Sequence, residues 1–224
     1  MEELRKRREL SNLYASMGWK EDHKLFVLGD TVIRREDNGD VIEEKSTLSS
    51  GTSRLSADMF GTNGSLQEWK NLTKILDLKA MPWHAFALSL AFAAPLFEFT
   101  GLKGMTISLY GPTGGGKTLV QYWIQSVYGD PNALHFAAKF TQNAMFSRLA
   151  MYNNLPMTVD EATMLQDKEI GDFLYWVSQG RDKARLTRAA EERDPKTWAT
   201  PVIVSTNISL AAKLLAAGMD SDAQ

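Results

Sequence analysis

The spacing of apolar and polar residues near the N-terminus predicts a small segment of mixed structure. Residues 2–17 have a helical pattern that ends at Gly18. Residues 24–45 have the pattern of strands, with Asn38-Gly39 as a hairpin turn. Residues 46–65 are rich in Ser, Thr and Gly and are the best candidate for a linker.

The pattern then changes to a helix start followed by alternating strands and helices. Ser65 and Glu68 form a capping-box pair, and the apolar residues that follow recur at helical spacing, as in a helix packed on a core: Leu66, Trp69, Leu72 and Leu76. Strands are expected over 105–110 (a buried one), 133–138, 155–162 and 200–207, and helices over 117–129, 141–154 (capped by Thr141, with Met145, Leu149 and Tyr152 on one face) and 168–180. This alternation favours a mostly parallel sheet covered by helices on both faces. The sequence therefore predicts a small α+β segment over 1–64 and an α/β core over 65–224.

The apolar segment 81–99 approaches the length of a membrane span. It contains two prolines and Glu98, and much of its apolar character comes from alanine. A charge and two prolines at membrane depth are unfavourable. We therefore expect a buried core helix here and no membrane association.

Composition narrows the possible chemistry. The chain has no cysteine, which excludes disulfides, thiolate metal sites and cysteine nucleophiles, and which fits a reducing, cytoplasmic location. Its formal net charge of -2 gives no general positive field for nucleic acid, so any such contact must come from a local patch.

A phosphate-binding loop is the clearest motif. Residues 111–118 fit the pattern G-x-x-x-x-G-K-[ST] and lie between an expected strand and an expected helix. Glycines let successive backbone N–H groups turn toward phosphate oxygens, and the helix N-terminus adds its dipole. The loop predicts ATP binding, with Lys117 reaching the β and γ phosphates and Thr118 holding Mg²⁺. The residues expected to bind ATP are Gly111, Pro112, Thr113, Gly114, Gly115, Gly116, Lys117 and Thr118.

Two later strands end in polar residues that suit hydrolysis. Asp160 and Glu161 end the strand 155–162, and Asn207 ends the strand 200–207. We expect Asp160 to hold the magnesium ion through water, Glu161 to orient and polarise the attacking water, and Asn207 to hold that water or to sense the γ-phosphate. A second acid after Asp160 suits hydrolysis better than transfer to a bound hydroxyl.

A basic segment lies between these two strands. Its positive charges are close together, with a single acid, Asp182, among them: Arg181, Lys183, Arg185 and Arg188. Three interpretations remain open: contacts to a nucleic-acid backbone, an arginine finger that reaches a neighbour's ATP, and a solvated loop whose charges pair locally.

The order of these motifs resembles that of ring-forming ATPases. The chain is similar to phage- and plasmid-associated helicase-like ATPases of the superfamily 3 and AAA+ type, among them primase-helicases and domains of unknown function. The resemblance runs from about Gly18 to the end and rests on GSLQEWK (64–70), the alanine-rich segment before the loop, GPTGGGKT, VDEA, GRDKAR, KTW and VIVSTN.

This resemblance implies a P-loop NTPase core with Walker A at 111–118, Walker B at Asp160-Glu161 and sensor 1 at Asn207. It also implies hexameric rings that share ATP sites between subunits, DNA gripped by the basic segment, and a role in phage or plasmid replication. Ring ATPases continue beyond sensor 1, whereas few residues follow Asn207 here. We therefore expect a chain that is truncated after sensor 1.

Three functions follow from these motifs. The first is an ATP-hydrolysing motor of helicase type that acts on DNA. The second is an ATP-binding assembly or loader module without unwinding activity. The third is a P-loop kinase for a small molecule, which the Asp-Glu pair and the strand-end Asn disfavour.

Overall fold

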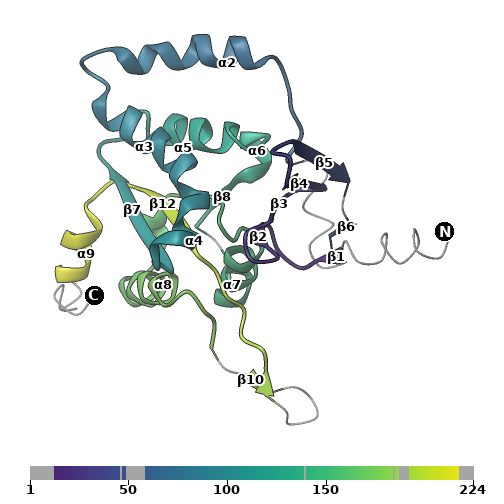
Figure 1. The fold of residues 1–224 in the computed structure, drawn as a ribbon. Helices are drawn as coiled ribbons and strands as arrows, with labels where there is room; N and C mark the ends of the chain where they lie inside the picture. The colour runs from purple at the N-terminus through teal and green to yellow at the C-terminus, as the bar shows by residue number, and fades with distance from the viewer. Residues whose placement is uncertain are drawn as a thin grey trace.

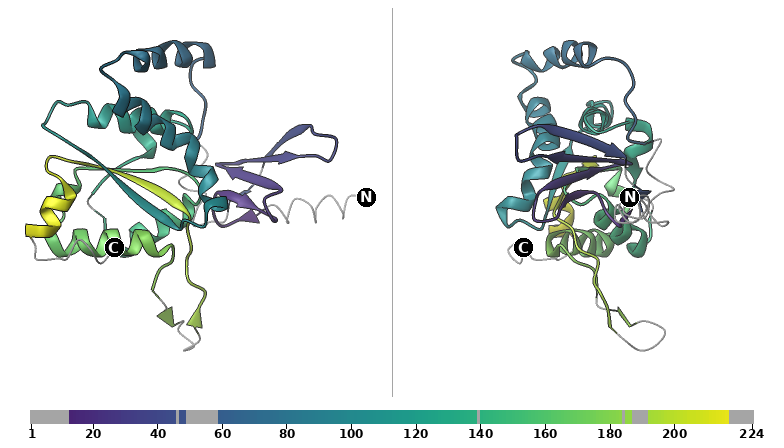
Figure 2. Two further views of the ribbon diagram at one scale, coloured as in Figure 1. Left: turned by 60° about the vertical axis from the view of Figure 1, so that its left-hand side comes forward. Right: turned by 45° about the vertical axis from the view of Figure 1, so that its right-hand side comes forward.

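The computed structural model describes residues 13–45, 47–48, 59–138, 140–183, 185–186 and 192–216. These residues form a parallel sheet with helices on both faces, and an antiparallel sheet beside it (Figures 1 and 2). The mixed α/β class expected from the alternating pattern is confirmed.

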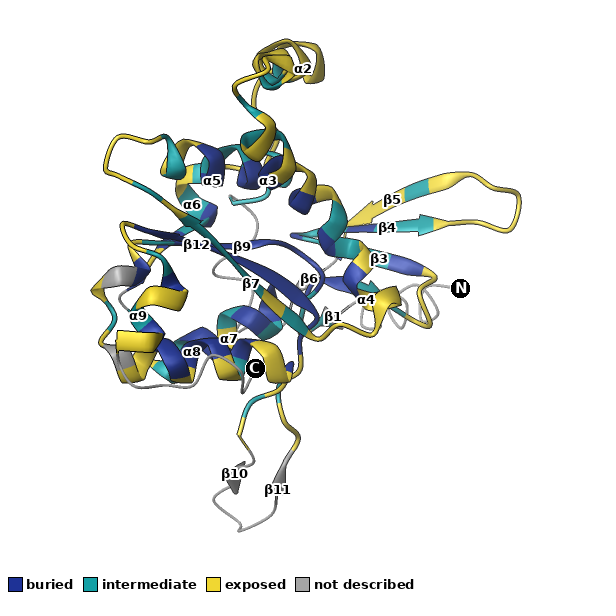
Figure 3. Ribbon diagram, turned by 90° about the vertical axis from the view of Figure 1, so that its left-hand side faces the viewer, coloured by how far each residue is buried: buried dark blue, intermediate teal, exposed yellow. Residues whose placement is uncertain are grey.

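The parallel sheet has the strand order β7-β12-β9-β8. Its strands are β7 (Gly104–Tyr110), β8 (His135–Ala137), β9 (Met157–Asp160) and β12 (Thr200–Thr206). Figure 3 shows α3 (Pro82–Ala93), α5 (Lys117–Ser126) and α6 (Pro131–Leu134) over one face, and α7 (Gln142–Met151), α8 (Asp167–Gln179) and α9 (Leu210–Ala216) over the other. All the strands and helices expected in this part of the chain are present.

The helix cap and the helix end expected from the sequence are both present in the structure. The Thr141 hydroxyl accepts a hydrogen bond from the Ala144 N–H at 3.3 Å and caps α7, and Met145, Leu149 and Tyr152 of its apolar face are all buried. Gly180 ends α8 in the left-handed conformation with φ of 66°. The start of α7 and the end of α8 are therefore set by contacts within a few residues.

Strand burial follows the position of each strand in the sheet. All seven residues of β12 are buried, because it pairs with β7 on one side and β9 on the other. In β7 most residues are only half-buried, and Met105 and Tyr110 are exposed. The expectation of a buried strand over 105–110 was wrong in this respect, because β7 lies at an edge of the sheet.

The antiparallel sheet contains β2 (Gly18–Lys20), β3 (Leu25–Leu28), β4 (Thr31–Arg35) and β5 (Val41–Lys45), in that order. The expected hairpin is present, because the Glu36 N–H donates to the Asp40 carbonyl at 2.8 Å and Gly39 has φ of 92°. Most of the expected linker, namely residue 46 and residues 49–58, lies outside the described residues.

The helix expected over 2–17 is wrong where it can be tested. Residues 2–12 lie outside the described part, but Leu13–Tyr14 form the strand β1, which pairs in parallel with β6 (Thr47–Leu48). The Met17 side chain is buried in the main core, and its N–H donates to the Met151 carbonyl at 2.9 Å. These long-range contacts override the local helical pattern.

A buried joint connects the two sheets. The Asn154 side chain is fully buried; its Oδ1 accepts from the Trp19 N–H at 3.1 Å, and its Nδ2 donates to Glu98 at 3.1 Å and to the Ala199 carbonyl at 3.3 Å. Asn154 has φ of 62°, and a Cβ added to Gly18 would lie 2.4 Å from the Asn154 Oδ1. The close approach therefore requires glycine at Gly18.

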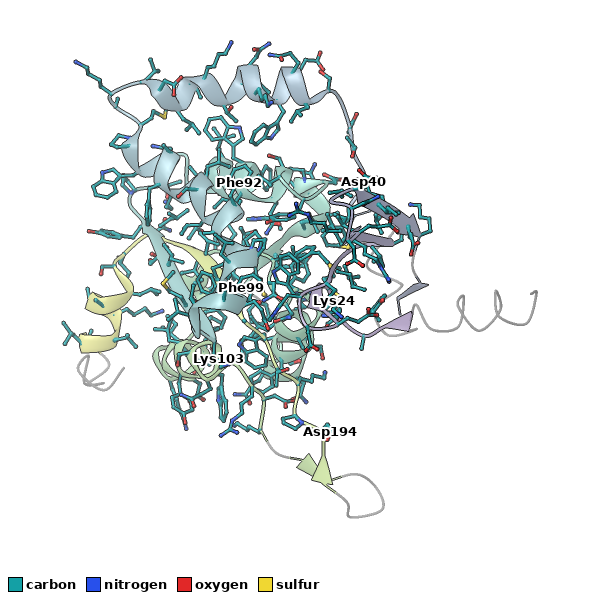
Figure 4. All side chains as sticks on the ribbon, viewed as in Figure 1. Lys24, Asp40, Phe92, Phe99, Lys103 and Asp194 are labelled. Atoms are coloured by element: carbon teal, nitrogen blue, oxygen red, sulfur yellow. The ribbon has the colours of Figure 1, made fainter. Side chains whose placement is uncertain are left out.

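The helix α2 (Leu66–Thr73) and the 3₁₀ turn η2 (Lys74–Asp77) stand above the body of the protein (Figure 1). The Ser65–Glu68 capping box is formed, as expected. Packing of the apolar stripe on the core was a wrong expectation, because α2 has no buried residue and Leu66 and Leu72 are about two-thirds exposed. Trp69 connects this helix to the body, through a 2.8 Å hydrogen bond to Ser126 and an edge contact with Phe92, which lies between α2 and the body (Figure 4).

The apolar segment 81–99 is divided into α3, the 3₁₀ turn η3 (Ala94–Leu96) and α4 (Phe97–Thr100). The expected core helix is confirmed on one face only: Ala87, Leu90 and Ala91 are buried, whereas Trp83, Phe86 and Phe92 are exposed. Among the described residues, none of the helices combines the length and the apolar character that a membrane crossing needs.

Candidate nucleotide-binding site

The glycine-rich loop joins the end of β7 to the start of α5. Three of its residues, Gly111, Gly114 and Gly116, have φ values of 155°, 83° and 77°. Gly114 and Gly116 therefore adopt a backbone that side chains disfavour, and this curls the loop around the N-terminus of α5. The loop directs N–H groups and the helix dipole to one place, which suits an anionic ligand.

Lys117 extends along the inside of the loop. Its Nζ donates to the carbonyl oxygens of Gly111 at 2.8 Å and Pro112 at 2.9 Å, and to the Asn207 Oδ1 at 3.3 Å. The ammonium group thus lies between the loop and the end of β12, although these segments are far apart in sequence.

Asp160 lies opposite, at the end of β9. Its Oδ2 accepts a hydrogen bond from the Thr118 hydroxyl at 3.2 Å, and its Oδ1 accepts one from the Glu161 N–H at 3.1 Å and a short one from the Ser205 hydroxyl. His135, from β8, places its Nε2 3.4 Å from the same Oδ2. Four neighbours therefore fix the orientation of this carboxylate.

These neighbours set the acidity of Asp160. Partial burial by itself would raise the pKa of the carboxyl. The hydrogen bond from Ser205, the charge that His135 can carry, and the hydrogen bonds from His135 and Thr118 outweigh burial, so the pKa lies below its ordinary value. Asp160 is accordingly an anion at neutral pH.

Glu161 follows Asp160 directly, and its side chain is exposed to the pocket. Its backbone has φ of 54°, an uncommon value for a residue with a side chain, and its N–H donates to the Ser205 hydroxyl at 3.0 Å. Strained residues concentrate at functional sites. The strain turns the chain so that Asp160 and Glu161 face different neighbours.

One pocket contains most of the residues singled out in the sequence. Its walls come from the loop, from the start of α5 and from the ends of β9 and β12: Thr113, Gly114, Gly115, Gly116, Lys117, Thr118, Leu119, Asp160, Glu161, Ser205, Thr206 and Asn207. Gly111 and Pro112 contact it through Lys117. The pocket lies at the carboxyl edge of a parallel sheet, where α/β proteins generally bind ligands.

The basic segment lies at the other end of the sheet. The strands β10 (Arg185–Leu186) and β11 (Glu192–Arg193) pair antiparallel and extend away from the body, where Figure 4 also places Asp194 (Figures 2 and 4). Arg181 is exposed at the base of this hairpin, and the Lys183 ammonium lies 4.8 Å from the centre of the Trp176 ring. Arg188 lies outside the described residues. Of the two cations whose side chains the structure describes, neither Arg181 nor Lys183 lines the pocket.

Sequence reasoning missed two residues that contact Asp160. Ser205 lies inside the apolar run before Asn207, and His135 lies in a strand with no recognisable motif. Alternation along β12 places Ser205 and Asn207 on one face, which was a usable signal for Ser205. The contact of His135 depends on β8 being next to β9, which the sequence does not show.

A family model described as "Domain of unknown function (DUF927)" matches residues 1–197, which is most of the chain. The chain belongs to this family. No curated protein matches the DUF927 chain.

Solved structures give a likeness in fold. A structure described as "SCCmec type IV Cch - active helicase" superposes with a TM-score of 0.62 at 20% identity, over 90% of this chain and 37% of that one. The DUF927 chain thus spans little more than a third of the helicase it matches. NtrX from Brucella abortus in complex with ATP gives a TM-score of 0.40 at 17% identity, over 70% of this chain and 40% of that one. The first likeness shows a shared fold, and the second is too low to support a conclusion.

Proposed function

We propose that this chain is the ATPase core of a helicase-type motor that acts on DNA. The observation that carries the proposal is the pocket that brings Lys117, Thr118, Asp160, Glu161 and Asn207 together from separate segments. A cation, a hydroxyl, two carboxylates and an amide at the mouth of a glycine-rich loop match the needs of nucleotide hydrolysis.

In this proposal the loop residues 111–118 hold the phosphates of ATP. Lys117 gives up its contacts with the Gly111 and Pro112 carbonyls and the Asn207 amide and neutralises the β and γ phosphates. The flexible lysine already lies in the pocket, so a change of side-chain rotamer is sufficient for this exchange.

The oxygen donors of Thr118 and Asp160 fit Mg²⁺, which prefers hydroxyl, carboxylate and water oxygens. Among the described residues, no group of three or more His, Asp and Glu side chains could hold a metal ion alone. Phosphate and water oxygens must therefore complete the coordination. When bound, the ion would neutralise charge on the transferred phosphate.

Hydrolysis needs a positioned water molecule as well. We assign the polarisation of this water to Glu161, whose carboxylate is exposed in the pocket, and its orientation or the sensing of the γ-phosphate to Asn207. Asn207 is close enough to the proposed phosphate site for either role, because its Oδ1 contacts the Lys117 ammonium group at 3.3 Å.

The basic hairpin is proposed to serve a second macromolecule. Arg181 follows the end of α8, whereas the pocket lies at the opposite end of the strands. A strand of seven residues separates Arg181 from the pocket by roughly 20 Å, so Arg181 cannot reach its own pocket. The basic segment is therefore proposed to contact a DNA backbone or, as an arginine finger, the ATP of a neighbouring subunit.

The remaining features of the proposal rest on the resemblance and the fold. The similarity to the Cch helicase, over part of its length, supports a helicase-type motor. A homo-oligomer, proposed to be a hexameric ring of the superfamily 3 or AAA+ type, rests on the resemblance in motif order alone. A division into 1–64 and 65–224, a place in phage or plasmid replication and a cytoplasmic location belong to the same proposal.

The test measures ATP binding and hydrolysis by the purified chain, with and without single-stranded DNA. Lys117→Ala is expected to abolish hydrolysis, whereas the control Lys79→Ala, at an exposed lysine outside the pocket, keeps the wild-type rate. Hydrolysis that persists in Lys117→Ala would refute the assignment of the pocket. ATP binding and self-association without hydrolysis or unwinding would favour the assembly module.

A further inference from the structure

A histidine that contacts Asp160 from behind the pocket lining is not explained by the functions assigned above. His135 begins β8, and its side chain is only 12% exposed. Its Nε2 lies 3.4 Å from the Asp160 Oδ2, and its Nδ1 lies 3.4 Å from the Thr158 Oγ1. The Tyr122 ring of α5 meets the imidazole edge-on, with 4.9 Å between ring centres. The imidazole is therefore held on three sides.

Strand register explains how this histidine reaches Asp160. His135 is directly opposite Thr158 in the parallel pair β8–β9. Side chains alternate along a strand, so Thr158 and Asp160 share one face of β9 and lie one step apart on it. The imidazole lies level with Thr158 and reaches diagonally across to the Asp160 carboxylate.

The hydrogen-bond pattern assigns the protons on the ring. The Gln125 Nε2 donates to the Pro156 carbonyl at 3.2 Å and to the Thr158 Oγ1 at 3.0 Å. Thr158 thus accepts from Gln125 and has its own hydroxyl proton free to donate to the His135 Nδ1. A neutral imidazole then carries its proton on Nε2, which donates to Asp160.

The two carboxylate oxygens of Asp160 have separate sets of partners. Oδ1 accepts from Ser205 and from the Glu161 backbone, both of which belong to the carboxyl ends of the strands. Oδ2 accepts from Thr118, the hydroxyl assigned to magnesium, and faces His135. His135 is therefore the Oδ2 partner that stays available when Thr118 turns to a metal ion.

We propose that His135 is a positioning residue for magnesium, which fixes the Asp160 carboxylate in the orientation that the ion requires. This inference rests on the proposed function of the pocket. Partners of metal-binding side chains typically contribute 10- to 100-fold to metal affinity, so about a tenfold effect is expected for a single long contact.

The variants His135→Ala and His135→Gln test the proposal in the full chain. The alanine variant removes the donor, whereas the glutamine amide can place a donor near the position of Nε2. Binding of a fluorescent ATP analogue is measured with a chelator present and in a titration with Mg²⁺, and Mn²⁺ bound with the nucleotide is followed by its paramagnetic resonance signal.

His135→Ala is expected to bind the nucleotide normally in chelator and to need about tenfold more Mg²⁺ for half-maximal response, with His135→Gln within a few-fold of wild type. An unchanged Mg²⁺ requirement in His135→Ala, or a glutamine variant as impaired as alanine, overturns the role of His135 alone. A wild-type chain that binds no nucleotide under any condition overturns the proposed function as well.

Discussion

The joint between the two sheets can be tested at Asn154, which is fully buried. Asn154→Ala leaves the part-buried Trp19 N–H without its side-chain acceptor, which costs about 1–3 kcal/mol. The bonds to Glu98 and the Ala199 carbonyl are lost too, at about 0.5–1.5 kcal/mol each. Alanine at φ of 62° adds roughly 1 kcal/mol. Since the losses are not strictly additive, we expect about 3–5 kcal/mol of destabilisation.

The assay is urea unfolding followed by tryptophan fluorescence, to which Trp19 at the joint contributes directly. With a slope of about 2 kcal/mol/M, the loss corresponds to a midpoint that falls by about 1.5–2.5 M. Asn154→Gly is the matched control, because it removes the same hydrogen bonds but tolerates the left-handed backbone. It is expected to be about 1 kcal/mol more stable than the alanine variant.

Two results would refute this reasoning. A midpoint shift in Asn154→Ala of less than about 0.5 M would mean that the buried amide contributes little to the joint. An alanine variant as stable as the glycine variant would mean that the backbone at this position relaxes out of the left-handed region. Gly18 gives an independent check, because Gly18→Ala must displace the same Asn154 side chain.

Two further predictions concern acid stability and the basic hairpin. Asp160 has a lowered pKa in the folded state, so its contribution to stability is present above the pKa of the unfolded chain, about 3.9, and is lost as pH falls through the lower folded value. The thermal midpoint of Asp160→Asn should therefore fall less than that of wild type between pH 6 and pH 3. Equal losses in the two proteins would contradict this. The double variant Arg181→Ala with Lys183→Ala should bind ATP normally but lose the stimulation of hydrolysis by single-stranded DNA. Its DNA binding should also depend less strongly on salt concentration. Unchanged stimulation would show that these two residues do not form the proposed DNA contact.

Local signals in the sequence predicted most of the core. The capping box at Ser65, the cap at Thr141 and the glycine at Gly180 act within a few residues, so they can be recognised without the fold. The position of the glycine-rich loop between a strand and a helix, and the strand ends near Asp160 and Asn207, were also predictable. Parallel strands place their carboxyl ends on one edge, and this brings such residues together in any strand order.

Features that depend on long-range packing were not predictable. The apolar stripe at Leu66 and Leu72 has the spacing of a buried helix face, but spacing does not show whether another element covers that face. Residues 13–17 form a strand and a buried anchor at Met17, because distant partners compete with the helical pattern. His135 contacts Asp160 only through the adjacency of β8 and β9.

The central strand β12 has a mechanical consequence. It is hydrogen-bonded to β7 along its whole length and to β9 over part of it, and every residue is buried. Such a strand cannot stretch or bend without breaking backbone hydrogen bonds on both sides. Its first residue follows the base of the basic hairpin, and its last residues precede Asn207. We therefore expect a displacement of Asn207 to move the base of the hairpin with it, and a force on the hairpin to move the end of β12 at the pocket.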